Sequence, residues 1–321
     1  MAGDDPMTRP LAELVDDYLT MRRGLGYRSV TNERSVRSFA RHLDGHAGPI
    51  PLEKTLEWAT ATSSCDPRNP ARRLVHVRDL LRYLHALDGT TDVPAPGMLG
   101  PTGHRPPPHV YSDAELVDLL DAAAGLDPVD GLRPRCYVTL FGLLACTGMR
   151  ISEALALSCA DVDLEGGVIT VRAGKRGLTR LVPLHATALG PLADYVSERE
   201  RRFGSPGPDE AFFRTDASER IGYEAARHAF VAVRRQLGWT ADGRTHAPRI
   251  HDLRHRMVVR RIEDWHAQGV DVDAKIPVLA TYLGHVEVRD VYWYLSAVPE
   301  LMSIVAKRFE AFAEQPPAGE R

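Results

Sequence analysis

A stretch rich in proline and glycine divides this sequence and constrains its fold more than any other feature. Residues 88–110 read DGTTDVPAPGMLGPTGHRPPPHV. So many prolines and glycines deny the backbone regular structure and are typical of an extended connector. The 321 residues also exceed the usual size of one domain. We therefore predict two domains, a linker between them and a disordered tail. The first domain spans residues 1–87, the linker 88–110, the second domain 111–315 and the tail 316–321.

The first predicted domain is helical and carries a basic surface. From about residue 10, apolar residues such as Leu11, Leu14 and Tyr18 recur at helical spacing. The segment from about 70 to 87 places four leucines and a valine on one face and its arginines off that face. Residues 1–87 are therefore expected to form a small bundle of amphipathic helices.

The second predicted domain is mostly helical and contains one small β-hairpin. Ser112 and Glu115 have the spacing of a capping box at the start of a helix. Residues 168–171 and 181–182 are β-formers separated by the turn-prone AGKRG. Helical spacing then recurs in later segments, at 186–203, 221–238, 250–267, 275–283 and about 299–313. The predicted fold class is mainly α with a small antiparallel β-sheet.

Composition narrows the class of protein. The formal net charge of -3 argues mildly against nucleic-acid binding, but residues 244–261 carry six arginines against one acid, Asp252. No apolar run approaches the roughly 18 residues of a membrane span, and the first residues do not form a secretion signal. We therefore expect a cytoplasmic protein. The four cysteines form no CxxC pair, which disfavours a disulfide framework or a zinc knuckle.

The segment TGMRISEAL contains the first candidate for chemistry. Gly148 permits a sharp turn, and Arg150 follows it at the start of a helix, where a guanidinium is well placed to bind a phosphate. Glu153, three residues on, could orient Arg150. Taken alone, such a segment is more often an exposed Arg–Glu pair at a helix start.

The segment HDLRH contains two further candidates. His251 and Arg254 are three residues apart and share one helix face, and an imidazole beside a guanidinium suits proton transfer next to a phosphate. His251 and His255 also have the spacing of the zinc motif HExxH. Asp252 stands where that motif has glutamate, however, and Arg254 would set a cation against the metal. A zinc hydrolase is thus a minor alternative, and we expect no metal and no cofactor.

The segment YLGHVEVRDVYWYL offers a histidine, His285, and downstream tyrosines. An aromatic cluster is by itself more often part of a core than of an active site. Tyr292, Trp293 and Tyr294 cannot all face one way on a helix, so at least one of them points elsewhere.

Together these segments resemble the phage integrase, or tyrosine recombinase, family. The family signature is an arginine after a TG turn, an HxLRH box, an LGH and a tyrosine about nine residues later. Here the order and spacing fit, and Tyr294 is the tyrosine nine residues after His285. AGKRGLTRLVPL supplies Lys175 as the hairpin lysine. Residues 270–302 look especially like the integrase-like transposases of mobile elements.

The resemblance implies a site-specific DNA recombinase that cleaves and rejoins strands through a 3′-phosphotyrosine. Tyr294 would be the nucleophile and His251 its base. Lys175 would protonate the leaving 5′-oxygen. The remaining residues of the site, Arg150, Arg254 and His285, would bind the non-bridging oxygens of the phosphate.

The resemblance also implies partners and leaves alternatives open. It implies an N-terminal core-binding domain, double-stranded recombination sites and a homotetramer assembled on the nucleoid DNA, with a possible partner recombinase or accessory factor. An apolar stripe in 299–313 fits docking on a neighbour or on its own domain. The alternatives are a type IB topoisomerase, which acts as a monomer, and a DNA-binding accessory protein that has lost cleavage.

Overall fold

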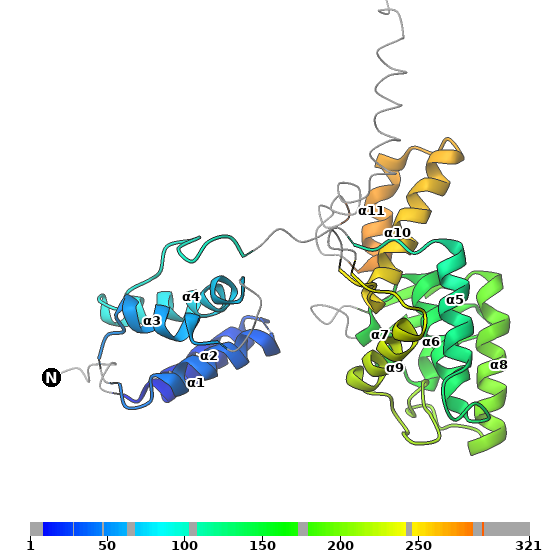
Figure 1. Ribbon diagram of the computed structural model, residues 1–321, viewed down its shortest axis with the longest axis horizontal. Coiled ribbons are helices and arrows are strands. Elements are labelled where there is room, and N and C mark those ends of the chain that lie inside the picture. The colour runs from blue at the N-terminus through cyan, green and yellow to red at the C-terminus, as the bar shows by residue number, and fades with distance from the viewer. Residues whose placement is uncertain are drawn as a thin grey trace, which may run out of the picture. The chain divides into compact units, whose positions relative to one another are not determined.

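Two compact units make up the chain, residues 1–105 and 106–321, here called the N-terminal and C-terminal units (Figure 1). A computed structural model describes residues 9–27, 29–46, 48–62, 68–102, 108–172, 179–241, 246–284 and 291. The boundary between the units lies inside the range expected for the linker.

Four helices form the described part of the N-terminal unit. They are α1 (Leu11–Gly24), α2 (Val30–His42), α3 (Leu52–Thr60) and α4 (Asn69–Asp88). α4 turns a fully buried face of leucines and one valine toward the other helices, and Tyr18, Phe39 and Trp58 complete the core. Apolar spacing produces this bundle, because each helix buries one stripe against the others. The predicted set of amphipathic helices is confirmed.

The segment after α4 differs from the free connector that its composition suggests. The buried Thr91 accepts a hydrogen bond from the backbone N–H of Ile50 at 3.2 Å. Arg78 donates to the carbonyl of Pro94 at 3.1 Å, and Val93 and Leu99 pack against the core of the bundle. Most of the segment therefore belongs to the N-terminal unit, since its carbonyls and apolar side chains find partners there.

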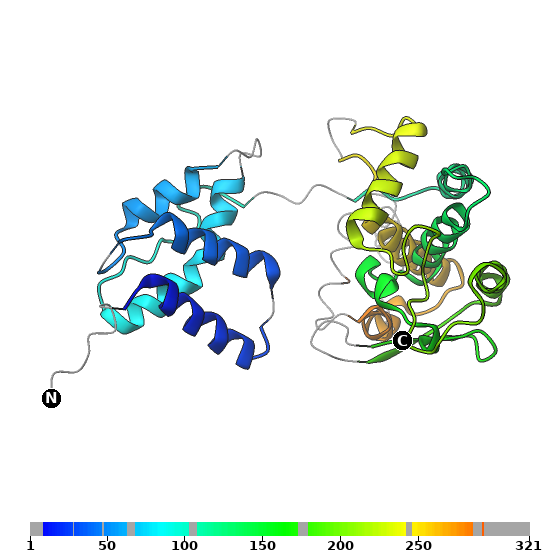
Figure 2. The ribbon, with the colours of Figure 1, turned by 90° about the horizontal axis from the view of Figure 1, so that it is seen from below.

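Helices also dominate the C-terminal unit. They are α5 (Asp113–Ala124), α6 (Leu132–Thr147), α7 (Ile151–Ala156), α8 (Ala186–Phe203), α9 (Tyr223–Gln236), α10 (Ile250–Ala267) and α11 (Val272–Leu283). The apolar α6 is buried along most of its length and packs against α5, α8 and α10. α5 and α8 are seen end-on in Figure 2. α5 begins with the predicted capping box, in which Ser112 and Glu115 bond to each other's backbone N–H groups.

One antiparallel sheet completes this unit. Its strands, β1 (Val162–Asp163), β2 (Val168–Val171) and β3 (Arg180–Pro183), lie in chain order, with Ile169 opposite Val182. Ile169, Val171 and Val182 are buried, so one face of the sheet packs on the core. The predicted hairpin is confirmed, and the fold is mainly α with a small antiparallel sheet.

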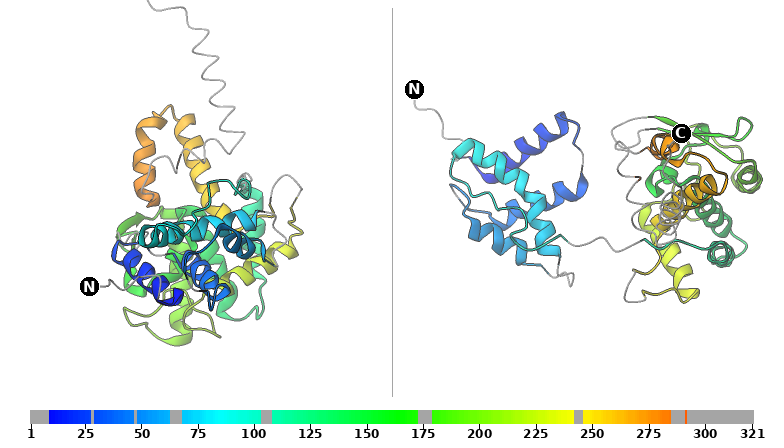
Figure 3. Two further views of the ribbon diagram at one scale, coloured as in Figure 1. Left: turned by 90° about the vertical axis from the view of Figure 1, so that its left-hand side faces the viewer. Right: turned by 90° about the horizontal axis from the view of Figure 1, so that it is seen from above.

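α10 and α11 extend together from one end of the unit (Figure 3). They share a separate apolar cluster that includes Val258, Ile276 and Leu283. The predicted helices over 250–267 and 275–283 are confirmed, although the second begins three residues earlier. In the parts of the chain that the structure describes, no helix is long and apolar enough to cross a membrane.

Candidate active site

Arg150 lies at a sharp junction between two helices. α6 ends at Gly148, whose φ of 64° is the left-handed conformation that glycine tolerates best. A Cβ on Gly148 would come within 3.1 Å of the Met257 sulfur, so the turn also packs closely on α10. Arg150 follows in extended conformation as the N-cap of α7. The sharp turn predicted at Gly148 is confirmed.

Glu153 binds Arg150, as its spacing predicted. Its carboxylate accepts from the backbone N–H of Arg150 at 3.0 Å and from Nη1 of Arg150 at 2.8 Å. Burial alone would raise the pKa of Glu153, but hydrogen bonds from Arg180 and Arg150 outweigh it and lower the pKa to about 2. The carboxylate is therefore charged at neutral pH and holds the guanidinium of Arg150 in place.

Arg254 reaches the same place from α10. The fully buried Asp252 accepts from the backbone N–H and the side chain of Arg249 and so closes the first turn of that helix. Arg254 lies in the second turn of α10, is 2% exposed and donates to the carbonyl of Gly148 at 2.6 Å. The α6–α7 turn and α10 are thereby joined through one guanidinium.

Three arginines from three elements meet at the carboxyl end of α11. Arg254 donates to the carbonyl of Leu283 at 2.8 Å, and Arg180 donates to that of Tyr282 at 2.9 Å. Arg150 donates to the carbonyl of Gly284 at 3.2 Å and, at 3.5 Å, to that of Leu283. The last carbonyls of a helix lack intrahelical partners and carry the negative end of its dipole, so cations stabilise them.

This geometry brings together two predicted site residues that lie far apart in sequence. Arg150 and Arg254 share the Leu283 carbonyl as an acceptor. The Arg150 side chain is 26% exposed, and among the described residues its Nε–H donates no hydrogen bond. The site can therefore present arginine N–H groups to an anion from a fixed framework.

His251 lies one turn before Arg254 on α10 and is partly buried. Its ring packs edge-to-face on that of the buried His255, with the ring centroids 5.0 Å apart. Among the described residues, no three His, Cys, Asp or Glu side chains form a metal-binding group.

Three predicted site residues, Lys175, His285 and Tyr294, lie outside the described residues, as does the predicted helix at 299–313. Two described residues, Gly284 and Val291, lie close in sequence to His285 and Tyr294. Gly284, directly before His285, is held by Arg150, and Val291, three residues before Tyr294, is fully buried in the α10–α11 cluster. Burial raises the pKa of another nearby tyrosine, Tyr282, to about 12, which makes it a poor nucleophile.

Arg180 also belongs to this site, although it was not among the residues predicted from the sequence. A usable signal existed, because side chains alternate along a strand and Arg180 shares the inward face with the buried Val182. An arginine facing inward requires a carboxylate or carbonyls as partners. Arg180 has both, in Glu153 and the Tyr282 carbonyl.

Replacing Gly284 should disturb both the backbone and Arg180. Gly284 has a φ of 65°, and a Cβ there would lie 2.9 Å from Nη1 of Arg180. Gly269 has a similar φ of 69° with nothing within 4 Å, so it serves as the matched control. We expect Gly269→Ala to lower the free energy of unfolding by about 1 to 2 kcal/mol. Gly284→Ala should cost about 1 kcal/mol more in urea unfolding; equal losses would show that the Arg180 contact is unimportant.

Acid should weaken the fold through Glu153. Its pKa is lower in the folded state than the ordinary 4.5, so its stabilising effect is complete above that value and is lost as the pH falls toward about 2. The free energy of unfolding should therefore fall more steeply between pH 4.5 and 2 in the native protein than in Glu153→Gln. Glu165→Gln, at an exposed position, controls for the loss of one charge. Parallel curves for the native protein and Glu153→Gln would contradict this prediction.

Comparisons with known proteins identify the family of this chain. Residues 111–300 match the Phage integrase family. The chain is 36% identical to the integrase/recombinase y4rB of Sinorhizobium fredii, over 93% of this chain and 96% of the relative. It is 29% identical to the tyrosine recombinase XerD of Mycobacterium tuberculosis, over 87% of this chain and 90% of the relative.

Solved structures share the fold. The integrase of the transposon Tn1549, in complex with transposon right end DNA, has a TM-score of 0.64 at 14% identity, covering 94% of this chain and 99% of that one. A lambda integrase tetramer bound to a Holliday junction has a TM-score of 0.59 at 15% identity, covering 85% and 80%. The chain belongs to the phage integrase family and is a tyrosine-type site-specific recombinase.

Proposed function

We propose that this recombinase cleaves DNA with Tyr294 and binds the scissile phosphate with Arg150 and Arg254. The observation that supports this assignment most strongly is the convergence of the two arginines on the end of α11, directly before His285. A phosphate next to this cluster would meet planar guanidinium groups whose geometry matches its oxygens.

The chemistry follows from the charge of the phosphodiester. The Tyr294 hydroxyl attacks the phosphorus while His251 takes its proton, and the bond from phosphorus to the 5′-oxygen breaks. Lys175 donates a proton to that oxygen. Arg150, Arg254 and His285 bind the non-bridging oxygens and stabilise the negative charge of the transition state. The 3′-phosphotyrosine conserves the bond energy, so attack by another 5′-hydroxyl rejoins strands without ATP.

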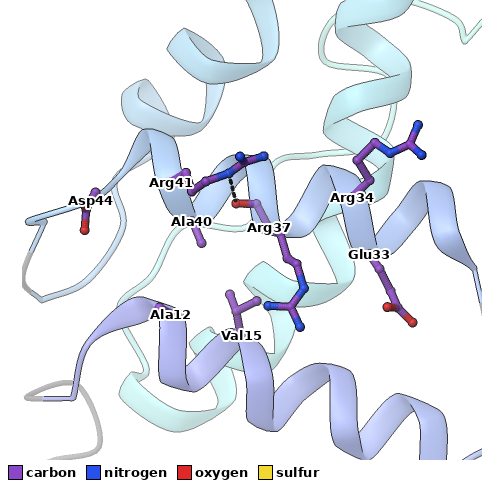
Figure 4. A pocket seen from close by; sticks show the side chains of 8 residues that line it. All are labelled: Ala12, Val15, Glu33, Arg34, Arg37, Ala40, Arg41 and Asp44. Atoms are coloured by element: carbon purple, nitrogen blue, oxygen red, sulfur yellow. Dashed lines mark hydrogen bonds between the residues drawn. The ribbon is translucent and has the colours of Figure 1, made fainter.

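The N-terminal unit would bind the same duplex as a core-binding domain. Arg34, Arg37 and Arg41 lie on successive turns of α2 beside a groove of about 630 Å³ against α1 (Figure 4). All three are exposed, and Arg37 forms an exposed ion pair with Asp16 at 2.8 Å. Exposed pairs contribute little, so DNA phosphates can replace the carboxylate.

Strand exchange between two duplexes requires four active sites, and we propose that four copies assemble on DNA, as in the lambda integrase tetramer. The likeness to the Tn1549 integrase supports movement of a mobile element. Such an enzyme would work in the cytoplasm on the nucleoid, and its segment 299–313 would dock on a neighbouring copy. A partner recombinase or accessory factor would determine when recombination occurs.

A covalent-trapping experiment tests the proposal. A duplex is selected by the protein from a randomised pool, nicked next to the cleavage point and incubated with the protein. We expect a protein–DNA complex that survives denaturation, and paired sites should yield joint molecules. Binding without a covalent complex would indicate an accessory protein, and relaxation of supercoils without joint molecules would indicate a topoisomerase.

A further inference from the structure

We propose that Arg180 is a positioning residue for DNA cleavage, which sets Arg150 and the end of α11 in their working arrangement. This inference rests on the proposed function, because it assigns Arg180 a part in building that same site. Arg180 would act through Glu153 and through the backbone that leads into His285.

The contacts of Arg180 join two parts of the site. Its Nη1 and Nη2 donate to the two oxygens of Glu153 at 3.0 and 2.7 Å, and its Nε donates to the Tyr282 carbonyl at 2.9 Å. The side chain is 13% exposed and that of Glu153 is 7% exposed. A bidentate ion pair between largely buried side chains has a fixed geometry, so the position of each side chain determines the position of the other.

Glu153 transmits this geometry to Arg150. The Oε1 atom that accepts from Arg180 also accepts from Nη1 of Arg150 at 2.8 Å. Without Arg180, the carboxylate would keep Arg150 as its cation and could rotate toward it. The guanidinium of Arg150 would then move relative to the α11 carbonyls that it now binds.

Arg180 also defines the backbone just before His285. The glycine of LGH lets the chain pass close to Arg180, because a Cβ on Gly284 would lie 2.9 Å from Nη1 of Arg180. Together with the bond to the Tyr282 carbonyl, this contact fixes the last turn of α11 against β3. The chain therefore enters position 285 from a defined point.

The position of Arg180 in the chain adds a third connection. It is the first residue of β3, five residues after Lys175, the proposed proton donor. The guanidinium that orients Arg150 thus also ties the base of the lysine hairpin to α11. Lysine could not replace Arg180 fully. Its ammonium lacks the planar fork with which the guanidinium binds both carboxylate oxygens and a carbonyl.

Arg172 provides a matched control on the same hairpin. It follows β2 and pairs with the buried carboxylate of Asp161, but its side chain is 64% exposed. Arg172→Met therefore removes an arginine–carboxylate pair from the same sheet and leaves the end of α11 intact.

The test measures the rate at which the covalent complex forms and the affinity for DNA, both on the nicked duplex. At saturating DNA, we expect Arg180→Met to slow formation of the covalent complex about 100-fold, the scale of a misplacement of about 1 Å. DNA affinity should change less than about 3-fold, because ground-state binding is retained. Arg180→Lys should recover only part of the rate. Arg172→Met should cleave at the native rate.

Two further measurements separate positioning from simple stabilisation. Added guanidinium ion, at concentrations too low to unfold the protein, should speed cleavage by Arg180→Ala but not by Arg172→Ala. In the Glu153→Gln background, Arg180→Met should slow cleavage clearly less than the roughly 100-fold expected in the native background, because both changes break the connection between Arg180 and Glu153.

Several results would overturn the inference. They are native-rate cleavage by Arg180→Met, an equal loss in Arg172→Met, no effect of guanidinium, or fully multiplicative losses with Glu153→Gln. If the native protein forms no covalent complex, the proposed function itself fails, and that outcome is distinguishable because it precedes any comparison of variants.

Discussion

Tyr294→Phe is expected to abolish the covalent protein–DNA complex, whereas Tyr292→Phe should still form it. The phenol oxygen of Tyr294 is the proposed attacking atom, so its removal should lower cleavage by at least about 1,000-fold. Tyr294 is distinguished from Tyr292 by its distance of nine residues from His285. The measurement is a denaturing gel of the nicked duplex after incubation with each variant.

The tyrosine pair supplies its own control. Both substitutions remove one hydroxyl from the same short segment, so an effect on folding alone should appear in both. Retained cleavage by Tyr294→Phe and none by Tyr292→Phe would move the nucleophile to Tyr292. Cleavage by both single variants would place the nucleophile elsewhere in the chain.

Arg254→Lys is expected to lose cleavage and stability together. The lysine keeps the positive charge but lacks the planar fork whose two Nη atoms bond the Gly148 and Leu283 carbonyls from a 2% exposed position. A buried carbonyl that loses its donor costs about 1 to 3 kcal/mol. Loss of one stabilising group for the transition state should slow cleavage by about 100- to 1,000-fold. Urea unfolding and single-turnover cleavage measure the two effects.

Arg261→Lys is the matched control, because Arg261 lies on the same helix at an exposed position. It should change neither quantity measurably. If Arg254→Lys were destabilised but cleaved at the native rate, Arg254 would be a structural link between α6, α10 and α11 and would not bind the phosphate.

Local features of this protein could be predicted from its sequence because they depend on neighbouring residues. Ser112 and Glu115 close a capping box three residues apart, and Gly148 takes the left-handed turn that precedes Arg150. The pairing of Glu153 with Arg150 has the same local origin. The β-formers on both sides of the turn-prone AGKRG likewise predicted the hairpin at 168–182.

The sequence by itself determined the family, the helical and sheet elements and the order of the proposed catalytic residues. Only the tertiary structure decided that Arg180 joins the site, that Arg150 and Arg254 share the Leu283 carbonyl, and that the segment after α4 packs on the first unit. Arg180 and Glu153 lie 27 residues apart, and Arg150 and Gly284 lie 134 apart. Contacts at such separations depend on how the elements pack. Side-chain spacing along one strand can place Arg180 on the inward face, but it cannot identify the residues that Arg180 contacts.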